Sequence, residues 1–102
     1  MILTVDIGNS NIVLGGVEGE QILFEARLRT DPTKTSDEYC IDLKMILEVY
    51  GVKSADVEGS IIASVVPQVL NSMQTALKKL TGVLGAVIGE AVCRLFRIRD
   101  RV

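Results

Sequence analysis

The chain has 102 residues and a formal net charge of −2; 48% of its residues are hydrophobic, 24% are charged and 4% are aromatic. This length supports one domain with a single core and excludes a two-domain enzyme with a deep interdomain cleft. The hydrophobic fraction excludes a disordered chain, and the absence of His excludes His-based zinc sites and His-dependent catalytic triads. The net charge gives no reason to expect nucleic acid as a partner.

Three strands are predicted in the first 29 residues. Residues 2–7 form a short apolar run rich in β-branched residues that stops at Gly8, and a second apolar run covers residues 11–17. Residues 21–29 alternate between apolar and polar side chains, which predicts a strand with one exposed face. The buried face of this strand is expected to carry Ile22, Phe24, Ala26 and Leu28. Because the links between the three runs are short, we expect an antiparallel meander.

A helix is predicted after residue 34. Thr35 and Glu38 fit a capping box, in which the two side chains satisfy the first backbone N–H groups of the helix. We interpret both residues as a helix cap and not as a substrate site. Gly51 is placed to end the helix. One face of the helix is expected to hold Tyr39, Leu43, Ile46, Leu47 and Tyr50.

Two further strands are predicted on either side of a second helix. Residues 61–66 form a compact apolar run typical of a buried strand, and Pro67 suits the first position of a helix. That helix is expected to end before Gly82, and residues 83–88 predict another short buried strand. The apolar face of the second helix is expected to hold Val66, Leu70, Met73, Leu77 and Leu80. The resulting order β-β-β-α-β-α-β predicts an α/β fold with a mixed sheet and helices packed on it.

The last residues differ in charge from the rest of the chain. Residues 1–93 carry seven basic and twelve acidic side chains, or −5, whereas residues 94–102 carry four arginines and one aspartate, or +3. Regular spacing of apolar residues also stops after Gly89. We therefore expect residues 1–89 to form the domain and residues 90–102 to form an atypical tail, which suits at most a weakly amphipathic helix.

The segment from Asp6 to Asn11, Asp-Ile-Gly-Asn-Ser-Asn, carries the clearest chemical signal. Asp6 is expected at the end of a buried strand, where a carboxylate needs a partner such as hydrated Mg²⁺. Gly8 lets the backbone approach an anion closely, and successive N–H groups in such turns form a nest for phosphate. Ser10 and the two asparagines add neutral hydrogen-bonding groups. The segment is therefore a candidate phosphate and metal loop carried on a hairpin.

The same segment is also an ordinary β-turn sequence, because Asn and Gly tolerate positive φ angles. Taken alone, the turn leaves both interpretations open. Its context favours the functional one, because the turn opens the chain and joins the first two strands of the predicted order.

That combination resembles the nucleotide-binding half-domain of the acetate and sugar kinase, heat-shock 70 and actin superfamily, which is a ribonuclease H-like (actin-like ATPase) fold. Within it, four motifs over about residues 1–89 resemble type III pantothenate kinases. These motifs are the Asp6–Asn11 segment, Arg29-Thr30 at the end of the third strand, Thr35 to Tyr39 at the start of the first helix, and Ile-Ala-Ser-Val-Val-Pro at residues 62–67.

The resemblance implies an activity and a set of site residues. Members of this family transfer the γ-phosphoryl group of ATP to the primary hydroxyl of pantothenate, the first step toward coenzyme A. They need Mg²⁺ and a monovalent cation (K⁺ or NH₄⁺) and act as homodimers. By resemblance, Asp6 holds the metal ion through water and residues 8–11 wrap the ATP phosphates. The implied cofactor-binding residues are Asp6, Ile7, Gly8, Asn9, Ser10, Asn11, Ile12 and Val13.

The chain departs from the family pattern after Gly89. Neither the family's Gly-rich segment nor its Gly-Ala-Asp-Arg motif, whose aspartate is taken as the base, is found, so no catalytic residue is assigned. The second half-domain is also missing. We expect a truncated form, from a frameshift or a fragmentary gene, that lacks full activity and takes pantothenate only if the missing half is supplied. A non-catalytic nucleotide-binding or regulatory module is the alternative.

Several features favour a cytoplasmic protein. Cys40 and Cys93 have neither metal-ligand spacing nor the frame of a disulfide-rich domain. The first residues lack the basic and apolar regions of a signal peptide, and no apolar run approaches the roughly 18 residues of a membrane span. We therefore expect no membrane partner.

Overall fold

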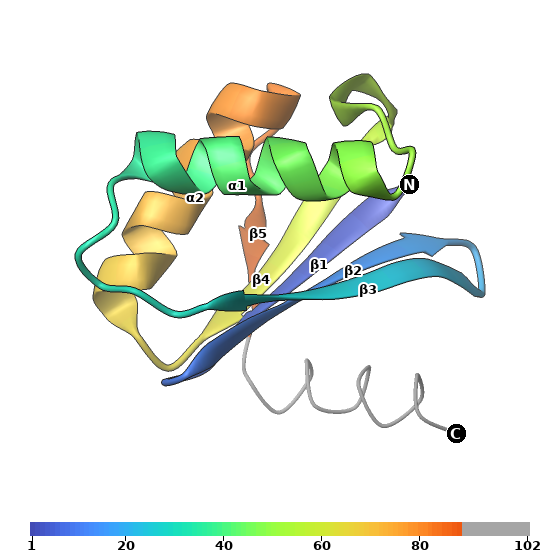
Figure 1. The fold of residues 1–102 in the computed structure, drawn as a ribbon. Helices are drawn as coiled ribbons and strands as arrows, with labels where there is room; N and C mark the ends of the chain where they lie inside the picture. Colours follow the sequence, from blue (N-terminus) through green and yellow to red (C-terminus); the bar gives the residue numbers. More distant parts are fainter. Residues whose placement is uncertain (89–102) are drawn as a thin grey trace.

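The computed structural model describes residues 1–88, which form a five-stranded mixed sheet with two helices against one of its faces (Figure 1). The strand order is β3-β2-β1-β4-β5. Strands β1, β2 and β3 are antiparallel neighbours, whereas β4 and β5 run parallel to β1. The elements are β1 (Ile2–Ile7), β2 (Asn11–Glu18), β3 (Gln21–Arg29), α1 (Ser36–Val49), a 3-10 turn η1 (Ser54–Asp56), β4 (Gly59–Ser64), α2 (Pro67–Thr81) and β5 (Ala86–Val87). The predicted order and the mixed sheet are therefore confirmed.

The β2–β3 pair contains a register shift that the alternating pattern of β3 did not reveal. The shift lies between Gly16 and Val17, so that Phe24 pairs with Gly16 while Ile22 pairs with Val17. Phe24 is buried, whereas Ile22 and Leu23 are 42% and 48% exposed. The prediction that Ile22 shares a buried face with Phe24 is wrong, because the extra residue of the bulge breaks the period of two.

Helix α1 begins and ends where the sequence predicts. Thr35 and Glu38 form the capping box, with the Glu38 N–H donating to Thr35 Oγ1 at 3.2 Å and the Thr35 N–H donating to Glu38 Oε1 at 3.0 Å. The chain leaves the helix at Gly51, whose φ is +72°. Tyr50 is the C-cap and is 48% exposed, although its ring stacks on that of Phe24 with 4.9 Å between the ring centroids. The buried residues of the helix are Tyr39, Leu43 and Leu47.

Strand β4 is displaced by two residues from the predicted range 61–66. It ends at Ser64 because the Ser64 hydroxyl accepts from the Val66 N–H and donates to the Val66 carbonyl, both at 2.9 Å. This local hydrogen bonding turns the chain out of the sheet, as serine hydroxyls commonly do. Helix α2 then begins at Pro67, as predicted.

The far edge of the sheet differs most from the prediction. The sequence predicts a buried strand over residues 83–88, but β5 has only two residues and both are exposed. It pairs with β4 alone, and Leu84 and Val87 are 67% and 51% exposed. Helix α2 buries Val69 and Ala76 besides the predicted Met73 and Leu77, so its apolar face is rotated slightly from the predicted one.

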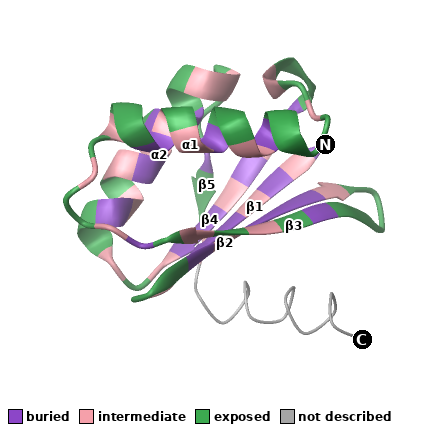
Figure 2. Cartoon of the chain, in the orientation of Figure 1, coloured by how far each residue is buried: buried purple, intermediate pink, exposed green. Residues whose placement is uncertain are grey.

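The core lies between the sheet and the two helices, which pack against each other (Figure 2). Along β1, Leu3, Val5 and Ile7 belong to this core. Because side chains alternate along a strand, Thr4 and Asp6 lie on the opposite face of the sheet. The predicted boundary at Gly89, the tail after it and Cys93 lie outside the described residues.

Candidate phosphate-binding turn

The turn that joins β1 to β2 lies where two parallel strands end. Strands β1 and β4 are in register, with Ile7 beside Ser64, and the Val65 N–H donates to the Ile7 carbonyl at 3.0 Å. The turn is closed by the Gly8 N–H, which donates to the Asn11 carbonyl at 2.9 Å. Carboxyl ends of parallel strands are the usual place for ligands in α/β sheets. The strand-to-helix junction after Ser64 therefore lies at the same end of the sheet as the turn.

Thr30, the residue directly after β3, holds this turn with two hydrogen bonds. Its hydroxyl donates to the Gly8 carbonyl at 2.8 Å, and its N–H donates to the Ser10 carbonyl at 3.0 Å. Thr30 is itself buried, with 8% of its surface exposed. Two donors of one residue therefore fix the backbone of the turn at two points.

Most carbonyl groups of residues 7–11 accept hydrogen bonds from within the protein. Protein N–H or hydroxyl groups donate to the carbonyl oxygens of Ile7, Gly8, Ser10 and Asn11. Carbonyl oxygens carry negative partial charge and repel an anion. Because these carbonyls accept hydrogen bonds within the protein, they do not face a phosphate that approaches the turn. Neutral, exposed side chains remain on the outside of the turn, and these are Asn9, Ser10 and Asn11.

Asp6 is the acidic group nearest to this turn along β1. Only 5% of its surface is exposed, and its in-register neighbours are Val13 on β2 and Ala63 on β4. Within residues 1–88, no three Cys, Asp or Glu side chains form a metal-binding cluster. Mg²⁺ commonly binds proteins through one or two carboxylates and fills its remaining positions with water and substrate phosphates. A single buried carboxylate beside a turn that suits phosphate fits that type of ion.

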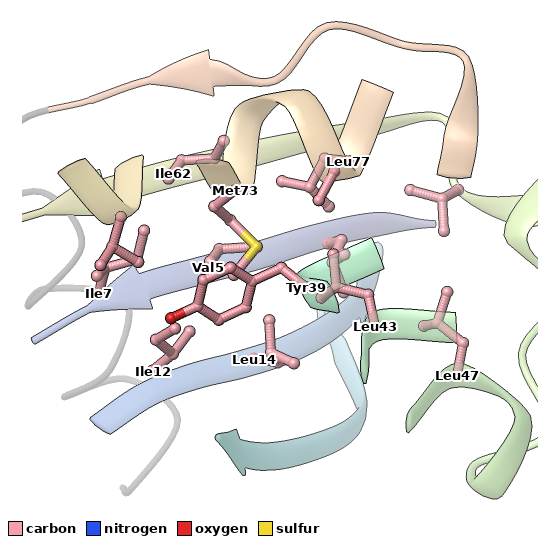
Figure 3. Packing of buried hydrophobic residues seen from close by; sticks show 14 of the residues in the cluster. Val5, Ile7, Ile12, Leu14, Tyr39, Leu43, Leu47, Ile62, Met73 and Leu77 are labelled. Carbon is pink, nitrogen blue, oxygen red and sulfur yellow. The ribbon is translucent and has the colours of Figure 1, made fainter. Parts of the chain in front are cut away.

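The remaining predicted site residues divide into two groups. Ile7 and Ile12 are 0% exposed and belong to the core beneath α1, so their side chains point away from the turn's outer surface (Figure 3). Val13 is half-buried and lies beside Asp6. Any contact that residues 7 and 12 make with a ligand is therefore limited to their backbone atoms.

Sequence reasoning missed Thr30 and Tyr39 as parts of the site's framework. Tyr39 is 0% exposed, and its hydroxyl accepts from the Asp31 N–H at 2.9 Å and donates to the Asp31 carbonyl at 2.8 Å. Figure 3 shows the Tyr39 ring among Val5, Ile12 and Leu14, its hydroxyl pointing toward the Ile7 and Ile12 end of the strands. The Arg29-Thr30 pair was the available signal, but it was recognised only as part of a family pattern.

Charged side chains in the loop after β3 are hydrogen-bonded to neighbouring groups. Two hydrogen bonds from Thr33 lower the pKa of Asp31, one from the hydroxyl at 2.6 Å and one from the N–H at 2.9 Å. A hydrogen bond to Asp42, 2.5 Å long, raises the pKa of Lys34, whose Nζ also lies 5.6 Å from the centre of the Tyr39 ring. The Thr33–Asp31 bonds lie within the loop, and the Lys34–Asp42 pair links the loop to α1.

Comparison with known proteins settles the family. The family model for type III pantothenate kinase matches residues 2–100. The chain belongs to the type III pantothenate kinase family. The match continues past Gly89, so the prediction that the resemblance ends there is wrong. The domain boundary at Gly89 stays a prediction.

Curated relatives in two bacteria support the same membership. The type III pantothenate kinase of Finegoldia magna is 42% identical over 92 residues, which cover 90% of this chain and 35% of the relative. That of Bifidobacterium longum subsp. infantis is 39% identical over 99 residues, which cover 97% of this chain and 39% of the relative. The chain thus spans a little over a third of the length of these relatives.

Solved structures confirm the fold. A ROK hexokinase from Thermus thermophilus matches with a TM-score of 0.65 at 16% identity, covering 88% of this chain and 34% of the hexokinase. RuvC from Thermus thermophilus matches with a TM-score of 0.55 at 21% identity, covering 86% of this chain and 60% of RuvC. These likenesses confirm the predicted ribonuclease H-like, actin-like half-domain. Among residues 1–88, neither helix has the length and apolar character needed to cross a membrane.

Proposed function

We propose that this chain forms the N-terminal, ATP-phosphate-binding part of a pantothenate kinase. Such an enzyme transfers the γ-phosphoryl group of ATP to pantothenate in the first step of coenzyme A biosynthesis. Family membership supports the activity, and the observation that carries the site is a turn whose carbonyl groups are bound internally beside the buried carboxylate of Asp6. Phosphoryl transfer depends mainly on positioning and on neutralising charge, which a turn and a carboxylate-held ion supply.

Each part of the proposed site has a distinct role. Asp6 would hold Mg²⁺, which neutralises negative charge on the phosphates when it is bound. The backbone of residues 8–11 would surround the phosphates, with Ser10 and the asparagines offering hydrogen bonds. By family, we also propose a monovalent cation (K⁺ or NH₄⁺), a homodimer and a cytoplasmic location for the whole enzyme.

Catalysis needs more than the residues of this chain. No residue here is assigned as the base toward pantothenate, so we expect the 102-residue chain alone to bind Mg·ATP without transferring phosphate. Pantothenate would bind only when the part of the relatives' sequence that this chain does not cover is also present. A non-catalytic module is not favoured, because the matched relatives are kinases.

Titration calorimetry with Mg·ATP tests the binding role of Asp6. We expect Asp6→Asn to weaken Mg·ATP binding by on the order of a hundredfold, because the variant removes the charge that holds the ion. Glu20→Gln in the exposed β2–β3 turn is the matched control and should leave the affinity unchanged. Equal affinity of Asp6→Asn and the unsubstituted chain would overturn the proposed site.

A coupled assay for ADP release tests the expected lack of turnover. The assay contains the chain, ATP, pantothenate, Mg²⁺ and K⁺, and we expect no ADP above the background of the reagents. Clear turnover that Asp6→Ala abolishes would show that the chain is catalytic by itself and would contradict this part of the proposal.

A further inference from the structure

The phosphate-binding turn is fixed by a residue distant from it in sequence. Thr30 lies 22 positions after Gly8, yet its hydroxyl donates to the Gly8 carbonyl at 2.8 Å. Its N–H donates to the Ser10 carbonyl at 3.0 Å. With 8% of its surface exposed, Thr30 has almost no contact with water, so these two bonds have little competition from solvent.

Asp31, the next residue along the chain, is held by Tyr39 of helix α1. The Asp31 N–H donates to the Tyr39 hydroxyl at 2.9 Å, and that hydroxyl donates to the Asp31 carbonyl at 2.8 Å. The Tyr39 ring is fully buried in the core between the sheet and the helices (Figure 3). Helix α1 therefore holds the backbone of Asp31, and Asp31 is directly bonded to the residue that holds the turn.

We propose that Thr30 is a positioning residue for phosphate binding and that Tyr39 makes the position of the turn depend on helix α1. This inference rests on the proposed function of the turn. Thr30 keeps the Gly8 and Ser10 carbonyls directed into the protein, so that the outer surface of the turn stays favourable for an anion. It acts through the backbone of the turn and touches no substrate.

Loss of the Thr30 hydroxyl has a definite chemical consequence. A valine has nearly the same shape but no donor, so the half-buried Gly8 carbonyl would lose the hydrogen bond from Thr30. The carbonyl can then recover a hydrogen bond by rotating toward water, and this is the side from which phosphate would approach. A serine at this position keeps the donor and removes only a methyl group.

Three variants separate this role from a general loss of stability. Thr30→Val removes the donor, Thr30→Ser keeps it, and Thr33→Val is the matched control. The Thr33 hydroxyl donates to the Asp31 carboxylate, in the same loop but away from the turn. The readouts are the dissociation constant for Mg·ATP by calorimetry and the hydrogen-exchange rate of the Gly8 N–H by NMR, both well below the melting temperature.

We expect Thr30→Val to weaken Mg·ATP binding by about tenfold and to speed exchange of the Gly8 N–H by a similar factor. Thr30→Ser should restore both values to within about twofold, and Thr33→Val should leave both unchanged. Exchange at the buried Val5 N–H in β1 should stay constant, which shows that the effect is local. The proposal is overturned if Thr30→Val and Thr33→Val give the same values.

Tyr39→Phe tests the second half of the proposal. The variant keeps the buried ring and removes the hydroxyl that holds Asp31. We expect faster exchange at the Gly8 N–H, by less than in Thr30→Val, because the effect passes through one more residue. Unchanged exchange would overturn the coupling to α1. If the unsubstituted chain does not bind Mg·ATP, the proposed function fails, whereas the exchange rates still decide the role of Thr30.

Discussion

The antiparallel meander contains two turns that differ in what holds them in place. The β2–β3 turn at Gly19 and Glu20 is exposed, and Gly19 has a φ of +58° with no atom within 4 Å of a Cβ built on it. The β1–β2 turn has no residue with positive φ, but a Cβ on Gly8 would lie 3.2 Å from the Asn11 carbonyl oxygen. Glycine therefore provides a backbone conformation in one turn and close packing in the other.

The partners of the two turns differ as well. Thr30 bonds to Gly8 and Ser10 of the first turn, and Val65 bonds to Ile7 beside it. These partners come from the residue after β3 and from the junction before α2, so two segments distant in sequence support the first turn. A hairpin turn that serves only to reverse the chain needs no such support. Under the proposed function, this support would explain how an ordinary turn sequence forms a specific binding surface.

The largest effect on stability is expected in β2, the strand that connects the two turns. A Cβ on Gly16 would lie 2.4 Å from the Phe24 ring and 2.9 Å from Met1 Cε. Gly16→Ala should therefore overpack the core and lower the free energy of unfolding by about 1–3 kcal/mol, measured by urea titration. Mg·ATP affinity should not change while the chain is folded.

Gly59 provides the control for this substitution. A Cβ on Gly59 in β4 would meet Ile2 Cδ1 at 3.6 Å, which is ordinary contact. Gly59→Ala should leave stability unchanged or slightly raised. Equal stability of the two alanine variants would show that the Phe24 ring moves aside without cost.

Alanine at the glycine of each turn should separate stability from binding. Gly19→Ala places a side chain at positive φ and should lower the free energy of unfolding by about 1 kcal/mol, with no change in Mg·ATP affinity. Gly8→Ala pushes the Asn11 carbonyl out of place and should weaken Mg·ATP binding by roughly fivefold. Urea titration and calorimetry on both variants measure the two effects. Weaker binding in Gly19→Ala alone would reverse the roles assigned to the turns.

Local signals predicted most of the fold. The ranges of β1 and β3, the capping box of α1 and the proline that opens α2 follow from patterns within a few neighbouring residues. Such patterns depend only on residues that are close in sequence. For the same reason the order of elements, and with it the fold class, was predicted correctly.

Features that depend on distant contacts were not predicted. The bulge in the β2–β3 pair accompanies the packing of the Phe24 ring over Gly16 on the neighbouring strand. The early end of β4 was missed for another reason: Ser64 bonds to Val66 two residues later, inside an apolar run that reads as one strand. In the site, the turn was found from its own residues, but its support by Thr30 depends on a contact across 22 positions. Sequence patterns carry little information about partners so far apart.

The smallest expected effect concerns pH and the loop beside the first turn. Thr33 lowers the pKa of Asp31 below its ordinary value of 3.8 by donating two hydrogen bonds to the carboxylate. A lowered pKa in the folded state means that this contribution to stability is present above pH 3.8 and is lost as the pH falls through the folded value. Because the carboxylate is at the surface, the change in stability should be small.

An NMR titration of the Thr33 N–H from pH 6 to pH 2 measures this directly, and its midpoint should lie below 3.8. Thr33→Val removes the hydroxyl bond, one of the two, and should move the midpoint of Asp31 upward, toward its ordinary pKa. The protection factor of the Gly8 N–H, which is its exchange rate corrected for the intrinsic effect of pH, should stay constant across the same titration. The Thr30 and Tyr39 hydroxyls donate to backbone carbonyls and not to the Asp31 carboxylate. Loosening of the turn together with Asp31 protonation would mean that the carboxylate, and not the buried Tyr39 hydroxyl, supports the first turn.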